Sequence, residues 1–218
     1  TYQSQVDESR APRLLLRFDE AAGAAGFADS AGYGHAGQCS GAVCPTSGGR
    51  GRYGRAARFD GAANSVGVAN FPIVGRITLA AWIQPQATDG VRDIIAHGYA
   101  FNPSGEVYLR IANGKYQVGA WNGADHVAQV AVPPGDVGQW VHLAGMYDGF
   151  AWKLYRKGVE VASTTDNVGA VAVNADWAIG ARGGGGERFF QGAIDEAALF
   201  DRALSPAEAQ ALMDARYN

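Results

Sequence analysis

The segment GAIDEAALF, residues 192–200, contains a carboxylate that could bind a metal ion. Its alternation predicts a strand on which Ile194, Glu196, Ala198 and Phe200 share one side. Asp195 would then lie on the other side with Ala193, Ala197 and Leu199. An unpaired carboxylate among apolar neighbours is costly. Asp195 therefore needs a cationic partner, either a metal ion or an arginine.

A turn at residues 121–126, WNGADH, combines side chains that suit sugar recognition. Trp121 offers a flat apolar face for stacking on a sugar ring, while Asn122, Asp125 and His126 offer planar polar groups for its hydroxyls. Packing of Trp121 in the core or in the turn is the alternative.

Further loops carry candidate ligand-binding residues. Arg182 and Arg188 bracket the flexible stretch RGGGGER, whose glycines have the alternative role of a simple mobile loop. Asp89 lies in DGVRD and Tyr99 in HGYAFN. We expect these loops to be further candidates for ligand binding.

Catalytic motifs are scarce in this sequence. The histidines form no H-E-x-x-H metal motif, and no G-x-S-x-G segment presents a serine nucleophile. A lyase that uses Tyr99 with His97 or His142 stays open as an alternative. We expect a protein that is not an enzyme.

Composition narrows the possible partners. The 218 residues are 47% hydrophobic and 18% charged, which is typical of a globular domain. A net charge of −3 gives no electrostatic reason to bind nucleic acid, and no apolar run is long enough for membrane insertion. One basic cluster, Arg50, Arg52, Arg55 and Arg58, is expected to be a solvated loop.

The two cysteines, Cys39 and Cys44, lie five positions apart. A lone pair of this spacing is a poor zinc site, so we expect a local disulfide and an oxidising, extracellular setting. Two free thiols in a cytosolic protein are the alternative.

Short apolar segments recur every 8 to 12 residues from Leu14 onward, which predicts an all-β fold, a two-sheet antiparallel β-sandwich of about a dozen strands. Hairpin turns are expected at residues 113–114, 122–123, 148–149 and 157–158. The capping-box sequence SPAE, residues 205–208, opens a short C-terminal helix to about residue 215. Residues 1–12 are expected to be a linker or N-terminal arm, residues 13–218 one domain, and residues 20–57 mainly a long ordered loop.

Six segments resemble the laminin G-like, concanavalin A-like jelly-roll domains of secreted bacterial proteins. They are LLLRFDE (14–20), ADSAGYGHAG (28–37), ARFDGAANSVGV (57–68), ITLAAWIQP (77–85), WVHLAGMYDGFAWKLYRKGVEVA (140–162) and IGARGGGGERFFQGAIDEAALFDRALSPAE (179–208). The resemblance covers residues 14–212 in order. It implies a jelly roll with a binding rather than a catalytic role, although the fold alone names no ligand.

The resemblance also implies a structural calcium ion. Asp29, Asp60 and Asp195 lie in the segments most similar to the family's metal-binding region, and oxygen ligands suit calcium. The alternatives are that Asp29 and Asp60 bind their own backbone in turns and that Asp195 pairs with an arginine.

The predicted function is therefore a secreted or cell-surface binding module for a glycan or cell-surface polysaccharide. A protein-binding adhesin or receptor-type domain is the first alternative. A polysaccharide lyase or glycoside hydrolase is the second, although the E-x-D-x-x-E strand of similar jelly-roll glycosidases does not occur.

Overall fold

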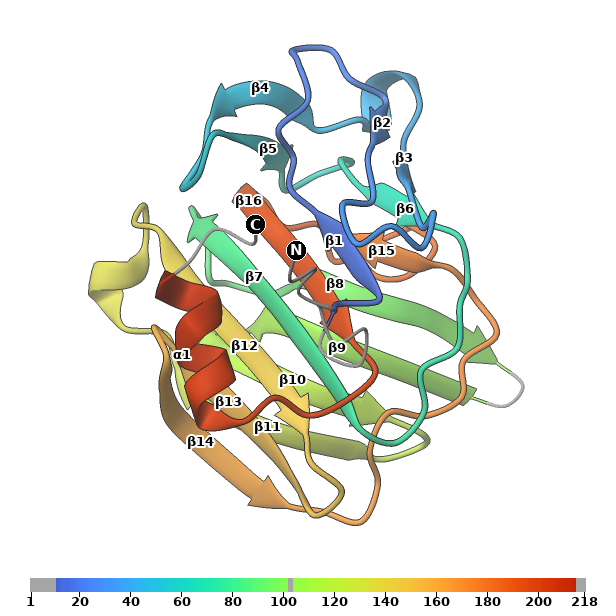
Figure 1. Ribbon diagram of the computed structural model, residues 1–218, viewed down its shortest axis with the longest axis vertical. Helices are drawn as coiled ribbons and strands as arrows, with labels where there is room; N and C mark the ends of the chain where they lie inside the picture. The colour runs from blue at the N-terminus through green and yellow to red at the C-terminus, as the bar shows by residue number, and fades with distance from the viewer. Residues whose placement is uncertain (1–10, 102–103, 215–218) are drawn as a thin grey trace, which may run out of the picture.

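The computed structural model describes residues 11–101 and 104–214 and contains two antiparallel sheets that face each other (Figure 1). The predicted all-β sandwich is thus confirmed. The first sheet has the order β14-β13-β12-β7-β16-β5-β4, with β1 paired to β16. Its strands are β1 (Leu14–Leu16), β4 (Thr46–Arg50), β5 (Arg55–Asp60), β7 (Ile77–Pro85), β12 (Val141–Tyr147), β13 (Ala151–Arg156), β14 (Val159–Thr165) and β16 (Gln191–Phe200).

The second sheet has the order β11-β10-β9-β8-β15-β6-β3-β2. Its strands are β2 (Gly26–Phe27), β3 (Gly37–Gln38), β6 (Val66–Val68), β8 (Val91–Phe101), β9 (Ser104–Ala112), β10 (Lys115–Trp121), β11 (Asp125–Ala131) and β15 (Trp177–Ile179). The edge strands β11 and β14 lie beside each other, so the two sheets approach along this edge (Figure 1).

The core fills the space between the sheets, as the alternation of apolar residues predicts. From β7, Ile77, Leu79, Ala81 and Ile83 point inward and are fully buried. From β9 the inward residues are Val107, Leu109 and Ile111. Because successive strand residues face opposite sides, Glu106, Tyr108 and Arg110 of β9 point to the outer face.

The predicted hairpin turns are all present. Asn113 and Gly114 have positive φ angles of 48° and 76°, and Lys157 and Gly158 have 50° and 77°. These are the paired left-handed conformations that two-residue hairpin turns require. Trp121 pairs with Asp125 across the 122–124 turn, so β10 and β11 form a hairpin as well.

The alternation predicted for β16 is wrong after Asp195. The pairing of β16 with β7 shifts between Asp195 and Ala198, and Glu196 has a φ of 48°. This β-bulge adds one residue and reverses the side on which later residues point. Ile194 therefore shares the inner core with Ala197 and Leu199, whereas Ala198 and Phe200 pack on the outer side.

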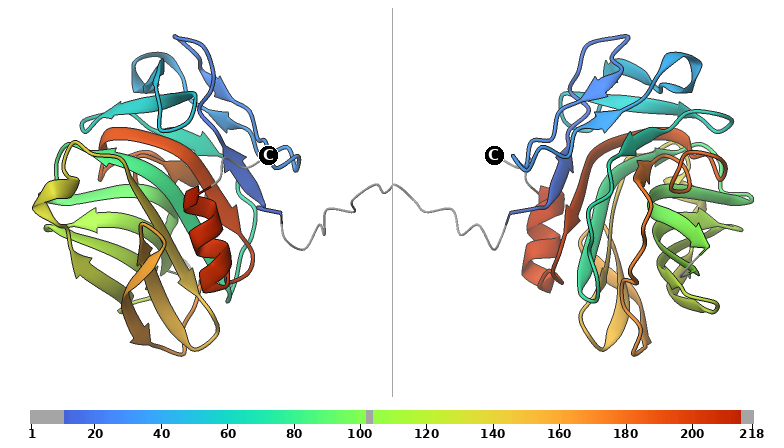
Figure 2. Two further views of the ribbon diagram at one scale, coloured as in Figure 1. Left: turned by 60° about the vertical axis from the view of Figure 1, so that its left-hand side comes forward. Right: turned by 90° about the vertical axis from the view of Figure 1, so that its right-hand side faces the viewer.

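The segment 20–57 is more structured than predicted. It contains β2, β3 and β4, and it reaches both sheets (Figure 2). These strands have two to five residues and little alternation, which explains why the sequence pattern does not reveal them. Together with other short strands they raise the number of strands in the described residues from the expected dozen to sixteen.

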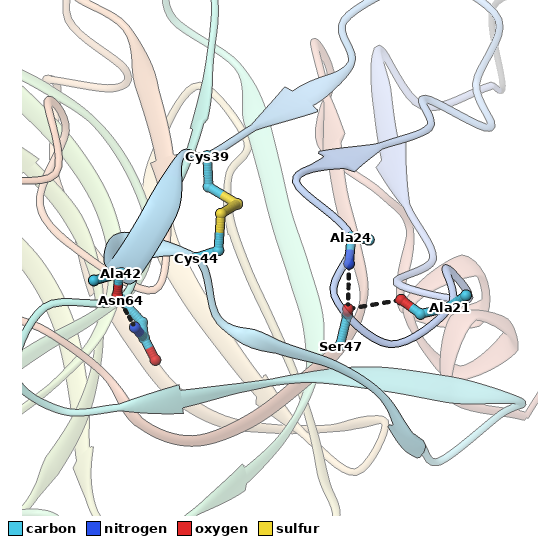
Figure 3. The surroundings of a disulfide bond; sticks show 7 residues. All are labelled: Ala21, Ala24, Cys39, Ala42, Cys44, Ser47 and Asn64. Atoms are coloured by element: carbon cyan, nitrogen blue, oxygen red, sulfur yellow. Dashed lines mark hydrogen bonds between the residues drawn. A yellow bond between two sulfur atoms is a disulfide. The ribbon is translucent and has the colours of Figure 1, made fainter.

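The predicted disulfide between Cys39 and Cys44 is present and closes the turn between β3 and β4 (Figure 3). Hydrogen bonds hold the same region on either side. The amide of Asn64 donates to the Ala42 carbonyl at 3.2 Å. Ser47 Oγ accepts from the Ala24 N–H and donates to the Ala21 carbonyl. The disulfide thus fixes a segment that has few apolar side chains of its own.

The C-terminal helix α1 (Pro206–Asp214) covers the outer face of the first sheet (Figures 1 and 2). The predicted capping box is confirmed, because Ser205 N–H donates to Glu208 Oε2 at 2.7 Å and Glu208 N–H donates to Ser205 Oγ at 3.3 Å. Ala209 and Leu212 pack against Ala198 and Phe200. No helix in the described residues is long and apolar enough to cross a membrane.

Most of the tryptophans that lie in strands have a structural role. Trp152 and Trp177 are fully buried in the core, and Trp82 is buried on the outer side of β7. Trp140, by contrast, is only partly buried. The basic cluster Arg50, Arg52, Arg55 and Arg58 is exposed, as expected, but it lies on the β4–β5 hairpin rather than in a loop.

Candidate functional site

A polar groove of about 520 Å³ lies on the outer face of β8–β11, opposite the face that packs in the core. We call it the sheet groove. It is lined by Val91, Glu106, Arg110, Trp121, Asp125, Arg182 and Arg188. The structure therefore brings together Trp121, Asp125, Arg182 and Arg188, which the sequence names as ligand-binding candidates.

Strand register arranges these side chains in rows. Glu106, Trp121 and Asp125 lie side by side on β9, β10 and β11. Four residues further along β9, Arg110 lies between Asp93 of β8 and Gln117 of β10. Side chains in such rows share one face of the sheet, so a single ligand can contact residues of several strands.

Polar contacts fix the side chains of the groove. Arg188 Nη1 donates to Glu106 Oε1 at 2.9 Å and to Oε2 at 3.0 Å. Arg110 lies over the Tyr108 ring, 3.6 Å from its centroid, and its Nε donates to Gln117 Oε1 at 2.8 Å. Arg182 Nη1 lies 2.6 Å from Glu187 Oε1. The guanidinium groups are thus held in place before any ligand arrives, which lowers the entropic cost of binding.

Asp93 lies beneath Arg188 with no exposed surface. Neither of its carboxylate oxygens has a hydrogen-bond partner, and the nearest Arg188 contact is 3.9 Å. Burial, with a smaller contribution from the nearby charge of Glu106, raises its pKa to about 7. Arg110, Arg188 and Arg182 oppose this shift.

Sequence reasoning missed Glu106 and Arg110, and it included Asp93 only as part of the candidate loop at residues 89–93. The alternation in EVYLRIA, residues 106–112, contains the signal, because it places Glu106 and Arg110 on the face opposite the core residues. The sequence does not reveal that this face stays free of covering elements and that residues 182–188 approach it.

The other predicted ligand residues lie elsewhere. Asp89 precedes β8 and pairs with Arg92 at 3.0 Å. Tyr99 belongs to β8, but its side chain lies outside the described residues. Asn122 and His126 bond to each other on the opposite side of the β10–β11 hairpin, where His126 Nε2 lies 2.9 Å from Asn122 Oδ1.

A second pocket, which we call the edge pocket, has a volume of about 510 Å³. It is lined by His126, Gly149, Phe150, Thr165, Asp166 and Asn167. It lies where β11 and β14 run side by side, and His126 Nδ1 links the two sheets through a 2.8 Å contact with Asp166 Oδ2. The β10–β11 hairpin therefore separates the sheet groove, lined by Asp125, from the edge pocket, lined by His126.

The three aspartates predicted to bind calcium each have hydrogen-bond donors of their own. Asp29 accepts from the N–H groups of Leu15, Ala31 and His35. Asp60 Oδ1 accepts from the N–H groups of residues 62–64. Asp29 and Asp60 thus make backbone hydrogen bonds like those of turn acids, and metal binding by either one stays a prediction.

Asp195 is fully buried, and its Oδ2 accepts from the Tyr53 N–H at 2.9 Å. Burial raises its pKa to about 7. Within residues 11–101 and 104–214, no group of three or more histidine, cysteine or acidic side chains is arranged to hold a metal ion. The three carboxylates as placed do not form one donor set, and calcium at Asp195 stays a prediction.

The histidines proposed for a lyase are buried. His97 stacks on Trp177 with centroids 3.9 Å apart, and its Nε2 lies 3.0 Å from Asn70 Oδ1. His142 packs against Trp82 on the outer face of the first sheet and is buried there. Burial lowers the pKa of both imidazoles to about 4. In this arrangement neither ring is presented to a substrate.

Several solved structures have a similar fold. Domain 4 of AbnA, a GH43 extracellular arabinanase from Geobacillus stearothermophilus solved in complex with arabinotriose, is 24% identical with a TM-score of 0.66, and the match covers 93% of this chain and 98% of that one. The binding domain of Paraclostridial Mosquitocidal Protein 1 is 16% identical with a TM-score of 0.71, and the match covers 94% of this chain and 52% of that one. The binding domain of Botulinum Neurotoxin DC, solved in complex with SialylT, is 11% identical with a TM-score of 0.68 and is covered over 52% of its length. At these identities the likeness shows the fold alone.

Sequence comparisons agree with the fold. Pappalysin-1 of Mus musculus is 53% identical over 34 residues, which are 16% of this chain and 2% of that protein. A laminin G family model, described as the concanavalin A-like lectin/glucanases superfamily, matches residues 59–210. The chain belongs to the concanavalin A-like lectin/glucanases superfamily.

Proposed function

We propose that this chain is a non-catalytic, extracellular carbohydrate-binding module whose ligand occupies the sheet groove. The observation that carries the proposal is the row of Glu106, Trp121 and Asp125, with Arg110, Arg182 and Arg188 around it. An aromatic side chain can stack on a sugar ring, and oriented charged groups can bind pairs of hydroxyls. The groove has the size and the mixed lining of a small-molecule site.

The balance of charge favours a neutral sugar. Arg188 is paired with Glu106, Arg182 with Glu187, and Arg110 Nη2 lies 4.0 Å from Asp125 Oδ1. Each of the three arginines therefore has an acidic partner, which weakens the attraction of the groove for an acidic ligand. Arg110 and Arg188 each carry five N–H groups, so they can also donate to sugar hydroxyls.

Two features support binding over hydrolysis. A retaining or inverting glycosidase presents two carboxyl groups to the glycosidic bond. Of the two carboxyl groups that line the groove, Glu106 is almost fully buried and accepts from Arg188 with both oxygens. Asp125 is therefore the single exposed carboxyl group in this lining, whereas the glycosidase mechanism uses two.

An extracellular location is part of the proposal. The Cys39–Cys44 disulfide supports it, since such bonds persist in oxidising compartments. The arabinanase whose domain 4 has a similar fold is described as extracellular.

The proposal predicts that the chain binds an oligosaccharide without converting it to a product. The chain should be screened against immobilised neutral and acidic glycans, and each hit should be confirmed by a rise in melting temperature. Chromatography of the same oligosaccharides after overnight incubation should show no new product. Product formation would contradict a binding module, and a screen with no hits would contradict the choice of ligand.

A further inference from the structure

Phe150 lies at the tip of the β12–β13 hairpin with 74% of its surface exposed. A ring exposed to this extent does not contribute the stabilising free energy that burial of an aromatic side chain provides. The ring lines the edge pocket together with Thr165, Asp166 and Asn167. An exposed ring beside a defined pocket indicates a contact surface rather than a packing residue.

The hairpin tip is rigidly built. Asp148 Oδ1 accepts from the N–H groups of Phe150 and Ala151, both at 2.9 Å. Arg76 Nε donates to the Asp148 carbonyl at 2.9 Å, and Lys153 Nζ lies 2.8 Å from Asp148 Oδ2. The backbone that carries the Phe150 ring is therefore fixed.

The opposite wall of the edge pocket is fixed as well. The Phe150 carbonyl accepts from the Asp166 N–H at 2.9 Å, which joins the two walls directly. Asp166 Oδ1 accepts from the Val168 N–H, and the Asp166 carbonyl accepts from the Tyr147 hydroxyl at 3.0 Å. His126 holds Asp166 Oδ2 from the other sheet.

From this arrangement we infer that the edge pocket is a second sugar-binding site, separate from the sheet groove, that takes a neutral sugar unit. The ring of Phe150 stacks on the apolar face of the sugar. Thr165 and Asn167, both exposed in the wall, and the carboxylate of Asp166 bind its hydroxyls. Asp166 is bound by His126, and the lining of the pocket contains no lysine or arginine that could attract an acidic sugar.

The two sites share one structural support. Trp121 and Asp125 project from the β10–β11 hairpin into the groove, while the adjacent His126 lines the edge pocket. A ligand with several sugar units can therefore contact both sides of this hairpin. Two linked contacts raise the affinity for long chains above that for short ones.

The experiment is NMR titration of the intact ¹⁵N-labelled chain with arabinotriose, cellotetraose and laminaritetraose, and with the acidic sialyl-T glycan as a comparison. At least one neutral sugar should shift amide signals of residues 148–151 and 165–167, with a separate set in residues 106–125. Phe150→Ala should lower the affinity measured from the signals of residues 148–151 and 165–167 about tenfold. The affinity measured from residues 106–125 should stay unchanged. Phe150→Tyr should retain both, and Val159→Ala is the matched exposed apolar control.

The outcomes separate this site from the sheet groove. If the Phe150→Ala variant still shows the signal shifts at residues 148–151 and 165–167, or if shifts occur only within residues 106–125, the second site is overturned. The proposal of a site in the sheet groove is then unaffected. Binding that depends on Phe150 but not on Trp121 supports the second site and overturns the groove. Absence of binding by every neutral sugar overturns both, and binding of the sialyl-T glycan alone at residues 148–167 overturns the choice of a neutral unit.

Discussion

Arg188 Nη1 donates to both carboxylate oxygens of Glu106, at 2.9 and 3.0 Å, and so connects the 182–188 loop to β9. Glu106 is almost fully buried, whereas about a quarter of the Arg188 side chain is exposed. The pair thus joins a loop to the floor of the groove. Its removal would leave a buried carboxylate without its cation.

We expect Arg188→Met to lower the free energy of unfolding by about 2 kcal/mol, at the low end for a broken buried pair because Arg188 is partly exposed. Arg182→Met is the matched control. Its partner Glu187 is half exposed, so its loss should cost less than about 1 kcal/mol. Urea denaturation of both variants measures the difference, and equal losses would contradict a structural role for the Arg188–Glu106 pair.

The buried acid Asp93 should make stability depend on pH. Its pKa is about 7 in the folded chain and near 4 in the unfolded chain, so the folded state holds the proton more tightly. The stabilisation of the folded state by protonated Asp93 is therefore fully present below pH 4 and is lost as the pH rises to about 7. Asp93→Asn removes this loss because the amide does not ionise.

The variant Asp93→Asn should match the original chain near pH 4 and exceed it by at least about 1 kcal/mol at pH 8. Chemical denaturation of both proteins over this pH range measures the free energy of unfolding of each. Subtracting one value from the other removes the contributions of the other titrating groups, which the two proteins share. A difference that does not change with pH would show that the pKa of Asp93 is the same in the folded and unfolded chains.

The disulfide between Cys39 and Cys44 closes a short loop, for which chain entropy predicts a stabilisation of about 2 kcal/mol. The double variant Cys39→Ala, Cys44→Ala should lower the melting temperature by roughly 4–8 °C in a chain of this size. Ligand binding should be unchanged, since neither pocket contains residues of this loop. A loss of glycan affinity in this double variant would show that the disulfide loop is not independent of the two pockets.

Calcium at Asp195 predicts a response to chelation. EDTA should lower the melting temperature of the original chain, and Asp195→Ala should abolish this response. Added magnesium is the control, because calcium sites with many oxygen ligands do not suit the smaller ion. An identical melting temperature with and without EDTA would rule out a stabilising calcium ion.

Much of the fold follows from local patterns in the sequence. Strict alternation in ITLAAWIQP and EVYLRIA identifies the faces of β7 and β9, and Asn113-Gly114 identifies a hairpin turn. The bulge at Glu196 is not predictable in this way, because it depends on how β16 pairs with β7. The short strands β2 and β3 likewise exist only through pairing with other strands.

The candidate site was predictable in part. Trp121 and Asp125 were identified from side-chain types in one turn, and Arg182 and Arg188 from their glycine-rich loop. Their meeting in one groove depends on sheet order, which brings β8–β11 together and leaves their outer face open. Phe150 has no sequence signal of its own, since an aromatic residue beside a turn is usually buried.

The most direct test of the proposed groove is isothermal titration of the Trp121→Ala variant with the best neutral glycan from the binding screen. We expect an affinity at least about tenfold lower than that of the original chain, because the stacking surface is lost. Tyr33→Ala, which removes an exposed aromatic ring that lines neither pocket, should bind as the original chain does. Unchanged affinity in Trp121→Ala would contradict the assignment of the sheet groove as the glycan-binding site.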